Sequence, residues 1–138
     1  MSITAQRLTV ARASGSCGAE VLGLALSGVP DDRTIAELRA AWLDHGVLFL
    51  RDIHLPPRDF LHFASQFGTP VEYPFVRGLE GFAQITPVVK EAHERVNFGG
   101  VWHSDTAYLE RPPMATMLVA REVPPCGGDT IFADARAA

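Results

Sequence analysis

The beginning of the chain shows short apolar runs separated by small polar residues. Two of these runs, Arg7 to Arg12 and Ala19 to Gly23, flank the turn-like Ser14-Gly15-Ser16. Runs of this length that are bounded by Gly and Ser are typical of strands. The pattern therefore predicts an opening β-hairpin.

A helix and a buried strand are expected next. Apolar residues recur at helical spacing from Asp31 to His45, which predicts a helix over this range. Either Asp31 or Asp32 can cap this helix, because a short acceptor side chain satisfies free amides of the first turn, and Gly46 ends it. The continuous apolar run Val47-Leu48-Phe49-Leu50 is too short for a helix and predicts a buried strand.

The middle of the chain combines a second helix with a strand and a polar segment. From Arg58 to Phe67 the apolar residues cover one helical side, and Gly68 is the expected C-cap. Phe82 to Val89 alternates like a strand. Lys90 to Gly100 is polar and predicts a mobile loop near a functional site.

Two further strands are expected towards the end of the chain. Met114 to Arg121 and Thr130 to Ala133 are β-rich, and Pro124 to Asp129 separates them as a turn. No internal repeat is visible. The pattern predicts one domain over residues 1–138, mainly β with flanking helices.

The composition is that of a folded, soluble domain. Of the 138 residues, 47% are hydrophobic and 20% are charged, close to globular averages. A net charge of −4 provides no broad basic surface for phosphate backbones, so we expect a small-molecule partner and no nucleic acid. No stretch approaches the roughly 20 apolar residues of a membrane span. Cys17 and Cys126 form no CxxC motif, which fits a reducing compartment. We therefore expect a cytoplasmic protein without a membrane partner.

The candidate chemistry lies in Trp102-His103-Ser104-Asp105. Side chains two residues apart on an extended backbone project to the same face, so His103 and Asp105 can converge on one ion while Ser104 points away. An imidazole and a carboxylate belong to the ligand set of a 2-His-1-carboxylate triad, which leaves one face of Fe(II) open. Taken alone the pair is weak, because H-x-D is more often a surface hydrogen-bonded couple. The same alternation argues against a hydrolase triad of these three residues.

The surroundings of this pair carry a family resemblance. The run WHSDTAYLERPPMATMLVAREVPPCGGDTIFAD resembles the taurine dioxygenase family of iron(II)- and 2-oxoglutarate-dependent oxygenases. The hallmarks of that family are a W-H-x-D start, a PP pair, an alternating strand and a G-G-D-T turn. The segment HGVLFLRD, followed by a helix that ends in Phe67-Gly68, looks like the family's first core strand and next helix.

This resemblance implies a double-stranded β-helix, or jelly roll. It also implies an enzyme that uses Fe(II), 2-oxoglutarate as cosubstrate and O2 to hydroxylate a small organic acid such as a sulfonate, with release of succinate and CO2. By match, His103 and Asp105 bind iron, and Thr130 contacts a 2-oxoglutarate carboxylate, although threonine is also an ordinary strand residue. Tyr73 and Asn97 are candidate substrate contacts, with packing and turn formation as their respective alternatives.

Two parts of the resembled site have no match. The family has a distal histidine as its third iron ligand and a downstream arginine that binds 2-oxoglutarate. No histidine follows Asp105, and Arg111, Arg121 and Arg136 lie too close to the motif. We therefore expect the chain to be the N-terminal part of a dioxygenase domain, truncated, inactive alone and prone to aggregate. A non-catalytic metal- or ligand-binding jelly-roll module is the alternative, and a homo-oligomer stays open.

Overall fold

The structure is a computed structural model that describes residues 8–26, 30–91, 93–96 and 98–138. The chain divides into two units. One consists of Met1–Pro56 together with Ala120–Ala138, and the other is Pro57–Val119. Each unit has its own architecture, and the candidate iron ligands lie in the second.

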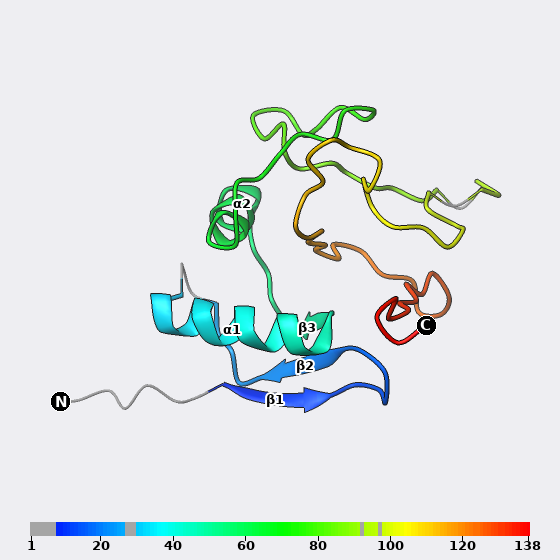
Figure 1. Ribbon diagram of the computed structural model, residues 1–138. Coiled ribbons are helices and arrows are strands. Elements are labelled where there is room, and N and C mark those ends of the chain that lie inside the picture. Colours follow the sequence, from blue (N-terminus) through cyan, green and yellow to red (C-terminus); the bar gives the residue numbers. More distant parts are fainter. Residues whose placement is uncertain (1–7, 27–29, 92, 97) are drawn as a thin grey trace. The chain divides into compact units, whose positions relative to one another are not determined.

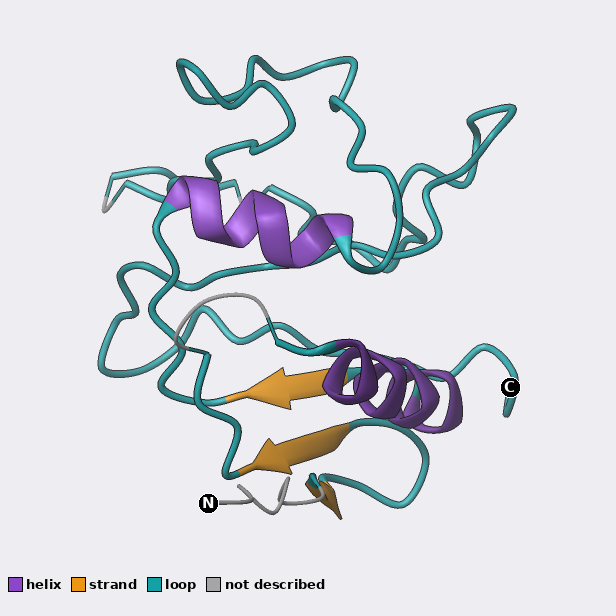
Figure 2. Cartoon of the chain, turned by 90° about the vertical axis from the view of Figure 1, so that its left-hand side faces the viewer, coloured by secondary structure: helices purple, strands orange, loops and turns teal. Residues whose placement is uncertain are grey.

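A three-stranded sheet with the order β1-β2-β3 forms the base of the first unit (Figures 1 and 2). β1 (Thr9–Arg12) pairs antiparallel with β2 (Ala19–Leu22), which confirms the predicted hairpin. β3 (Leu48–Leu50) pairs parallel with β2. Parallel neighbours need a crossover connection, and helix α1 (Asp32–His45) lies within it.

Both ends of α1 are explained by local chemistry. The Asp31 carboxylate accepts a hydrogen bond from the Thr34 amide at 2.8 Å, so the structure selects Asp31 from the two candidate caps. At the other end Gly46 has a φ of 76°, and its amide donates to the Trp42 carbonyl at 2.7 Å. Glycine reaches this conformation without a steric penalty. The predicted bounds of the helix are correct to within one residue.

The buried side chains of the first unit come from the sheet, from α1 and from the segment after β3. They are Ala19, Val21, Leu38 and Leu55. Ala19 and Val21 are two residues apart in β2 and so share one face of the sheet. Leu38, from α1, is 1% exposed. One face of β2 therefore contributes Ala19 and Val21 to the small apolar core of this unit.

Residues 120–138 join the first unit through side chains rather than through strand pairing. The Phe132 ring meets the Phe49 ring of β3 edge-on, with centroids 6.1 Å apart. The Arg136 guanidinium donates to the Leu43 carbonyl in the last turn of α1 at 3.1 Å. Carbonyls in the last turn of a helix lack partners within the helix, and a cation is favourable there. Arg136 thus ties the C-terminal segment to α1.

The second unit contains helix α2 (Pro57–Ser65). Its buried residue Phe63 meets the Phe67 ring edge-on, with centroids 5.3 Å apart. The helix begins one residue earlier and ends two residues earlier than predicted. After Ser65 the Phe67 amide donates to the Ala64 carbonyl three residues back, which is 3₁₀ geometry. Gly68 does not take the positive φ of a C-cap glycine, so that prediction is wrong.

Three predicted strands do not form. The segments 82–89, 114–121 and 130–133 are irregular. They have the residue pattern of strands, but a strand also needs a neighbouring strand that pairs with its backbone. Among the residues described, the one pairing of this kind that these segments make is the isolated bridge between Phe82 and Leu79, which extends into no strand. Apolar side chains in or beside them stay exposed, as at Val89 (69%) and Leu118 (68%). The described part of the chain therefore holds a small sheet with two helices.

Two predicted connections are irregular, as expected. The described residues of the 90–100 stretch contain no regular element, and the Lys90 ammonium donates there to the Val96 carbonyl at 3.0 Å. In the 124–129 turn, Gly127 and Gly128 have φ values of 78° and 74°. Neither of the two described helices, α1 and α2, has the length and apolar character of a membrane span.

Candidate functional site

His103 and Asp105 come together in the second unit. The Nε2 atom of His103 lies 2.9 Å from the Oδ1 atom of Asp105. Both side chains are about half exposed, at 48% and 49%. Ser104 separates them in a segment without regular structure. The two groups that the sequence proposes as metal ligands therefore point at one place.

A backbone carbonyl orients the imidazole. The Nδ1 atom of His103 lies 2.7 Å from the Val101 carbonyl oxygen. A carbonyl only accepts hydrogen bonds, so Nδ1 is the donor and Nε2 is the atom that faces Asp105. The Val101 carbonyl, followed by the Asp105 carboxylate, raises the pKa of His103. Metal-binding histidines are commonly held this way, with the second ring nitrogen donating to a carbonyl or a carboxylate.

The carboxylate of Asp105 is held from its other side. The Thr116 hydroxyl donates to Oδ2 of Asp105 at 2.7 Å, whereas Oδ1 faces His103. The chain turns sharply after Asp105, since Thr106 has a φ of 49° and its carbonyl accepts from the Leu109 amide at 3.0 Å. Each of the two candidate ligands thus has one orienting contact of its own.

The donor set fits part of a non-haem iron centre. An approach of 2.9 Å between Nε2 and a carboxylate oxygen is the length of an N–H···O hydrogen bond. It also brings two atoms of the types that bind iron close enough to share one ion beside them. One imidazole nitrogen and one carboxylate oxygen are two of the three ligands of a facial triad. In the part of the chain that the structure describes, no group of three His, Cys, Asp or Glu side chains could hold a metal. Taken as metal ligands, His103 and Asp105 would therefore be an incomplete set within the described residues.

The other candidate residues are Thr130, Tyr73 and Asn97. Thr130 is exposed in the first unit, directly after the Gly127 and Gly128 turn. Tyr73 lies in the second unit, with its ring 5.7 Å from that of Phe75 and nearly perpendicular to it. Asn97 falls outside the described residues. Of the sequence-derived candidates, the structure brings together His103 and Asp105.

Two residues that sequence reasoning missed contact the candidates. Thr116 is one of them, and its signal would have been a lone hydroxyl in the apolar run that follows the PP pair. Tyr108 is the other. The centroid of its ring lies 6.0 Å from that of Phe75. Loss of hydration is the larger cause that raises the pKa of the Tyr108 hydroxyl, and a hydrogen bond with Tyr73 raises it further. Tyr73, Phe75 and Tyr108 form an aromatic cluster, and its last member is three residues from Asp105.

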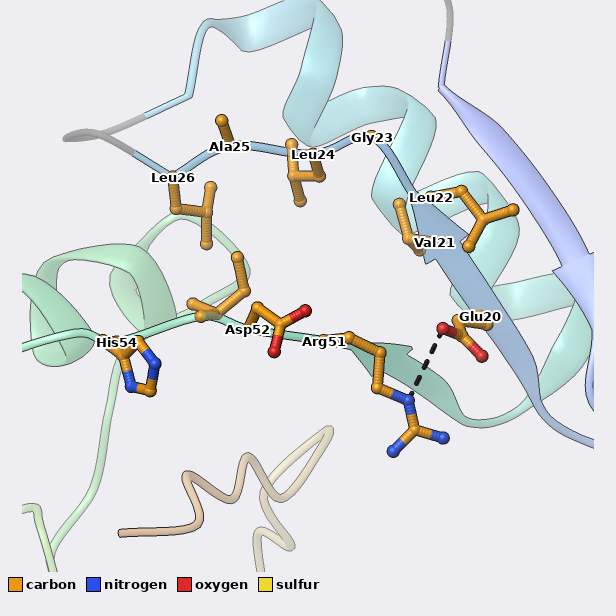
Figure 3. A pocket seen from close by; sticks show the side chains of 11 residues that line it. Glu20, Val21, Leu22, Gly23, Leu24, Ala25, Leu26, Arg51, Asp52 and His54 are labelled. Carbon is orange, nitrogen blue, oxygen red and sulfur yellow. Dashed lines mark ion pairs between the residues drawn. The ribbon is translucent and has the colours of Figure 1, made fainter.

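The first unit has a groove of its own. It has a volume of about 520 Å³ and is lined by residues 20–26 and 51–54 (Figure 3). Arg51 faces Glu20 there, with Nε 3.5 Å from Oε1. Asp52 follows with a φ of 56°. The sequence-derived site residues are not part of its lining.

An imidazole and a carboxylate are two of the ligand types found in mononuclear metal sites that leave one face open. The chain belongs to the taurine catabolism dioxygenase TauD, TfdA family, whose model matches residues 8–138. It is 33% identical to an alkylsulfatase of Acinetobacter baylyi over 134 residues, which is 96% of this chain and 41% of that protein. It is also 33% identical to an alpha-ketoglutarate-dependent sulfate ester dioxygenase of Pseudomonas putida, over 97% of this chain and 44% of that protein.

A solved structure supports the same relationship. The crystal structure of a taurine dioxygenase from Burkholderia xenovorans matches with a TM-score of 0.52 and 29% sequence identity. The match covers 56% of this chain and 28% of that one. The chain spans less than half the length of the two curated relatives, 41% and 44%.

Proposed function

We propose that the full-length protein is a non-haem dioxygenase dependent on Fe(II) and 2-oxoglutarate, also called alpha-ketoglutarate. The observation that carries this proposal is the 2.9 Å approach of His103 Nε2 to Asp105 Oδ1. Each of the two side chains is oriented by a separate hydrogen bond, from Val101 and Thr116. Family membership over residues 8–138 supports the same chemistry.

We propose further that the chain is the N-terminal part of a single jelly-roll domain. Two observations support this. The curated relatives are more than twice as long as the matched stretch. Three segments with a strand pattern join no sheet in the described ranges, and apolar side chains in or beside them are exposed. The third iron ligand, a histidine, and an arginine for the distal carboxylate of 2-oxoglutarate would come from the remainder of the domain.

Within this chain, His103 and Asp105 would hold the metal. Bound Fe(II) would couple decarboxylation of 2-oxoglutarate by O2 to hydroxylation of the substrate, with release of succinate and CO2. The Val101 carbonyl keeps the proton on Nδ1 of His103, so that Nε2 presents its lone pair. The Thr130 hydroxyl would donate one hydrogen bond to a 2-oxoglutarate carboxylate.

The proposed substrate is a small organic acid, a sulfonate or a sulfate ester. Two relatives are an alkylsulfatase and a sulfate ester dioxygenase, which favours the ester. The aromatic cluster of Tyr73, Phe75 and Tyr108 offers rings and hydroxyls close in sequence to Asp105. Rings would contact the organic part of the substrate, and Tyr73 would provide a polar contact. Asn97 is proposed as a second polar contact. We propose the cytoplasm as the location.

The function is tested with Asp105→Ala in the full-length protein. Glu110→Ala, which removes another exposed carboxylate of the same unit, is the matched control. We expect Asp105→Ala to lose Fe(II) affinity and succinate formation at least about 100-fold, because one of three ligands is gone. The control should keep both. Retention of normal iron-dependent 2-oxoglutarate decarboxylation by Asp105→Ala would refute the assignment.

A non-catalytic metal-binding jelly-roll module is the second candidate. It is favoured by the absence of a third ligand among the described residues. The same assay separates the two candidates. If the unmodified full-length protein binds Fe(II) through Asp105 but forms no succinate with any sulfonate or sulfate ester supplied, the module describes it better.

A further inference from the structure

We propose that Thr116 is a positioning residue for the iron site, because its hydroxyl fixes the orientation of the Asp105 carboxylate. This inference rests on the proposed function, in which His103 and Asp105 hold the metal. Thr116 lies eleven residues beyond Asp105 and is not itself a ligand in this scheme. It acts only through Asp105.

The hydrogen-bond geometry gives the two carboxylate oxygens different roles. Oδ2 accepts from the Thr116 hydroxyl at 2.7 Å, a length typical of a hydroxyl that donates to a charged carboxylate. Oδ1 lies 2.9 Å from Nε2 of His103. With Oδ2 engaged, Oδ1 is the oxygen that can bind a metal together with His103. The carboxylate is thereby set to bind through one oxygen.

Binding through one oxygen matters for this class of chemistry. A carboxylate that binds through both oxygens takes two coordination positions, whereas a facial triad must leave three positions open for the cosubstrate and O2. A contact that keeps Oδ2 away from the metal preserves the open face. Thr116 provides that contact within the described structure of the second unit.

The local sequence does not require a hydroxyl at this position. Thr116 lies in the apolar run Met114-Ala115-Thr116-Met117-Leu118, where β propensity alone would be met equally well by valine. Valine has nearly the same shape but no donor. β propensity therefore does not explain why the residue at this position carries a hydroxyl. The hydrogen bond from that hydroxyl to Asp105 does.

The two orienting contacts also differ in kind. His103 is held by the backbone carbonyl of Val101, which no side-chain substitution removes. Asp105 is held by a side chain. Thr116 is therefore the position at which the geometry of the metal site can be changed without replacing a ligand.

The test compares Thr116→Val and Thr116→Ser in the full-length protein, with Thr86→Val, another threonine of the same unit, as the control. The first readout is Fe(II) affinity, titrated without oxygen. The second is the visible absorption of bound Co(II), which reports coordination number. We expect Thr116→Val to bind Fe(II) about 10-fold to 100-fold more weakly and to shift the Co(II) spectrum. Thr116→Ser and Thr86→Val should match the unmodified protein.

Each other outcome has a defined meaning. Unchanged Fe(II) affinity and Co(II) spectrum in Thr116→Val would overturn the inference, and so would equal losses in the valine and serine variants, since packing would then be the role. Thr116→Ala removes the donor without adding a branch and replaces the valine variant if that one does not fold. If both donorless variants fail to fold while Thr116→Ser folds, the role is structural and the inference is wrong. Normal Fe(II) affinity in Asp105→Ala would instead overturn the proposed function.

Discussion

Leu38 of α1 belongs to the small apolar core of the first unit, and its replacement tests how much that core contributes to stability. Its side chain is 1% exposed, and it is the largest fully buried one in the described structure. Leu38→Ala removes buried methyl groups and leaves a cavity, at a cost of about 3 kcal/mol in the free energy of unfolding. Because about 1.4 kcal/mol corresponds to a tenfold change, the folding equilibrium should fall by roughly 100-fold.

Leu43 of the same helix provides the matched control. Its side chain is 58% exposed, so Leu43→Ala should cost about 0.5 kcal/mol or less. Both substitutions change helix propensity equally, and their difference therefore isolates burial. The assay is equilibrium urea unfolding of the full-length protein, followed by far-UV circular dichroism. Equal losses of stability in the two variants would refute the assignment of Leu38 to the core.

Three further predictions concern backbone, charge and aromatic contacts. Gly46→Ala should lower the free energy of unfolding by about 1 kcal/mol, because Gly46 has a φ of 76° that alanine rarely adopts. Gly15 has no positive φ, so Gly15→Ala should cost less in the same urea assay. Hydrogen bonds to the first turn of α1 lower the pKa of Asp31 from 3.8, so its stabilising contribution is present above pH 3.8 and lost as pH falls through the lowered value. Asp31→Asn should flatten this acid-side loss of stability, and an equally steep loss would contradict the cap. Tyr73→Phe should bring the pKa of Tyr108 closer to 10.0 in an ultraviolet titration, and no change would exclude their hydrogen bond.

Most of the predicted elements that formed are set by local chemistry, whereas β3 forms by pairing with β2 across the α1 crossover. The hairpin of β1 and β2, helix α1 and strand β3 agree with the pattern to within a few residues. In α1 the cap at Asp31 is a contact across three residues, and such contacts can be read from the sequence. The segments 114–121 and 130–133 have equally clear strand patterns but are irregular. Strand formation depends on a partner elsewhere in the chain, which no local pattern reveals.

The candidate site also combines a contact that residue spacing predicts with contacts that it does not predict. His103 and Asp105 are two residues apart, so their convergence on one point follows from spacing, and the surrounding motifs identified the family. The contact of Thr116 with Asp105 spans eleven residues. The aromatic cluster joins Tyr73 to Tyr108 across a long irregular stretch. Neither contact had a signal in residue spacing.

By itself, the sequence determined the candidate ligand pair, the family and the helices, because these depend on side chains that are neighbours along the backbone. Only the tertiary structure decided which oxygen of Asp105 faces His103, and which residue holds the other one. Both contacts depend on the turn after Asp105, which brings Thr116 back to the Asp105 carboxylate. The course of that turn depends on backbone angles such as the positive φ of Thr106. Residue order does not specify such angles in advance, since a positive φ is uncommon for threonine.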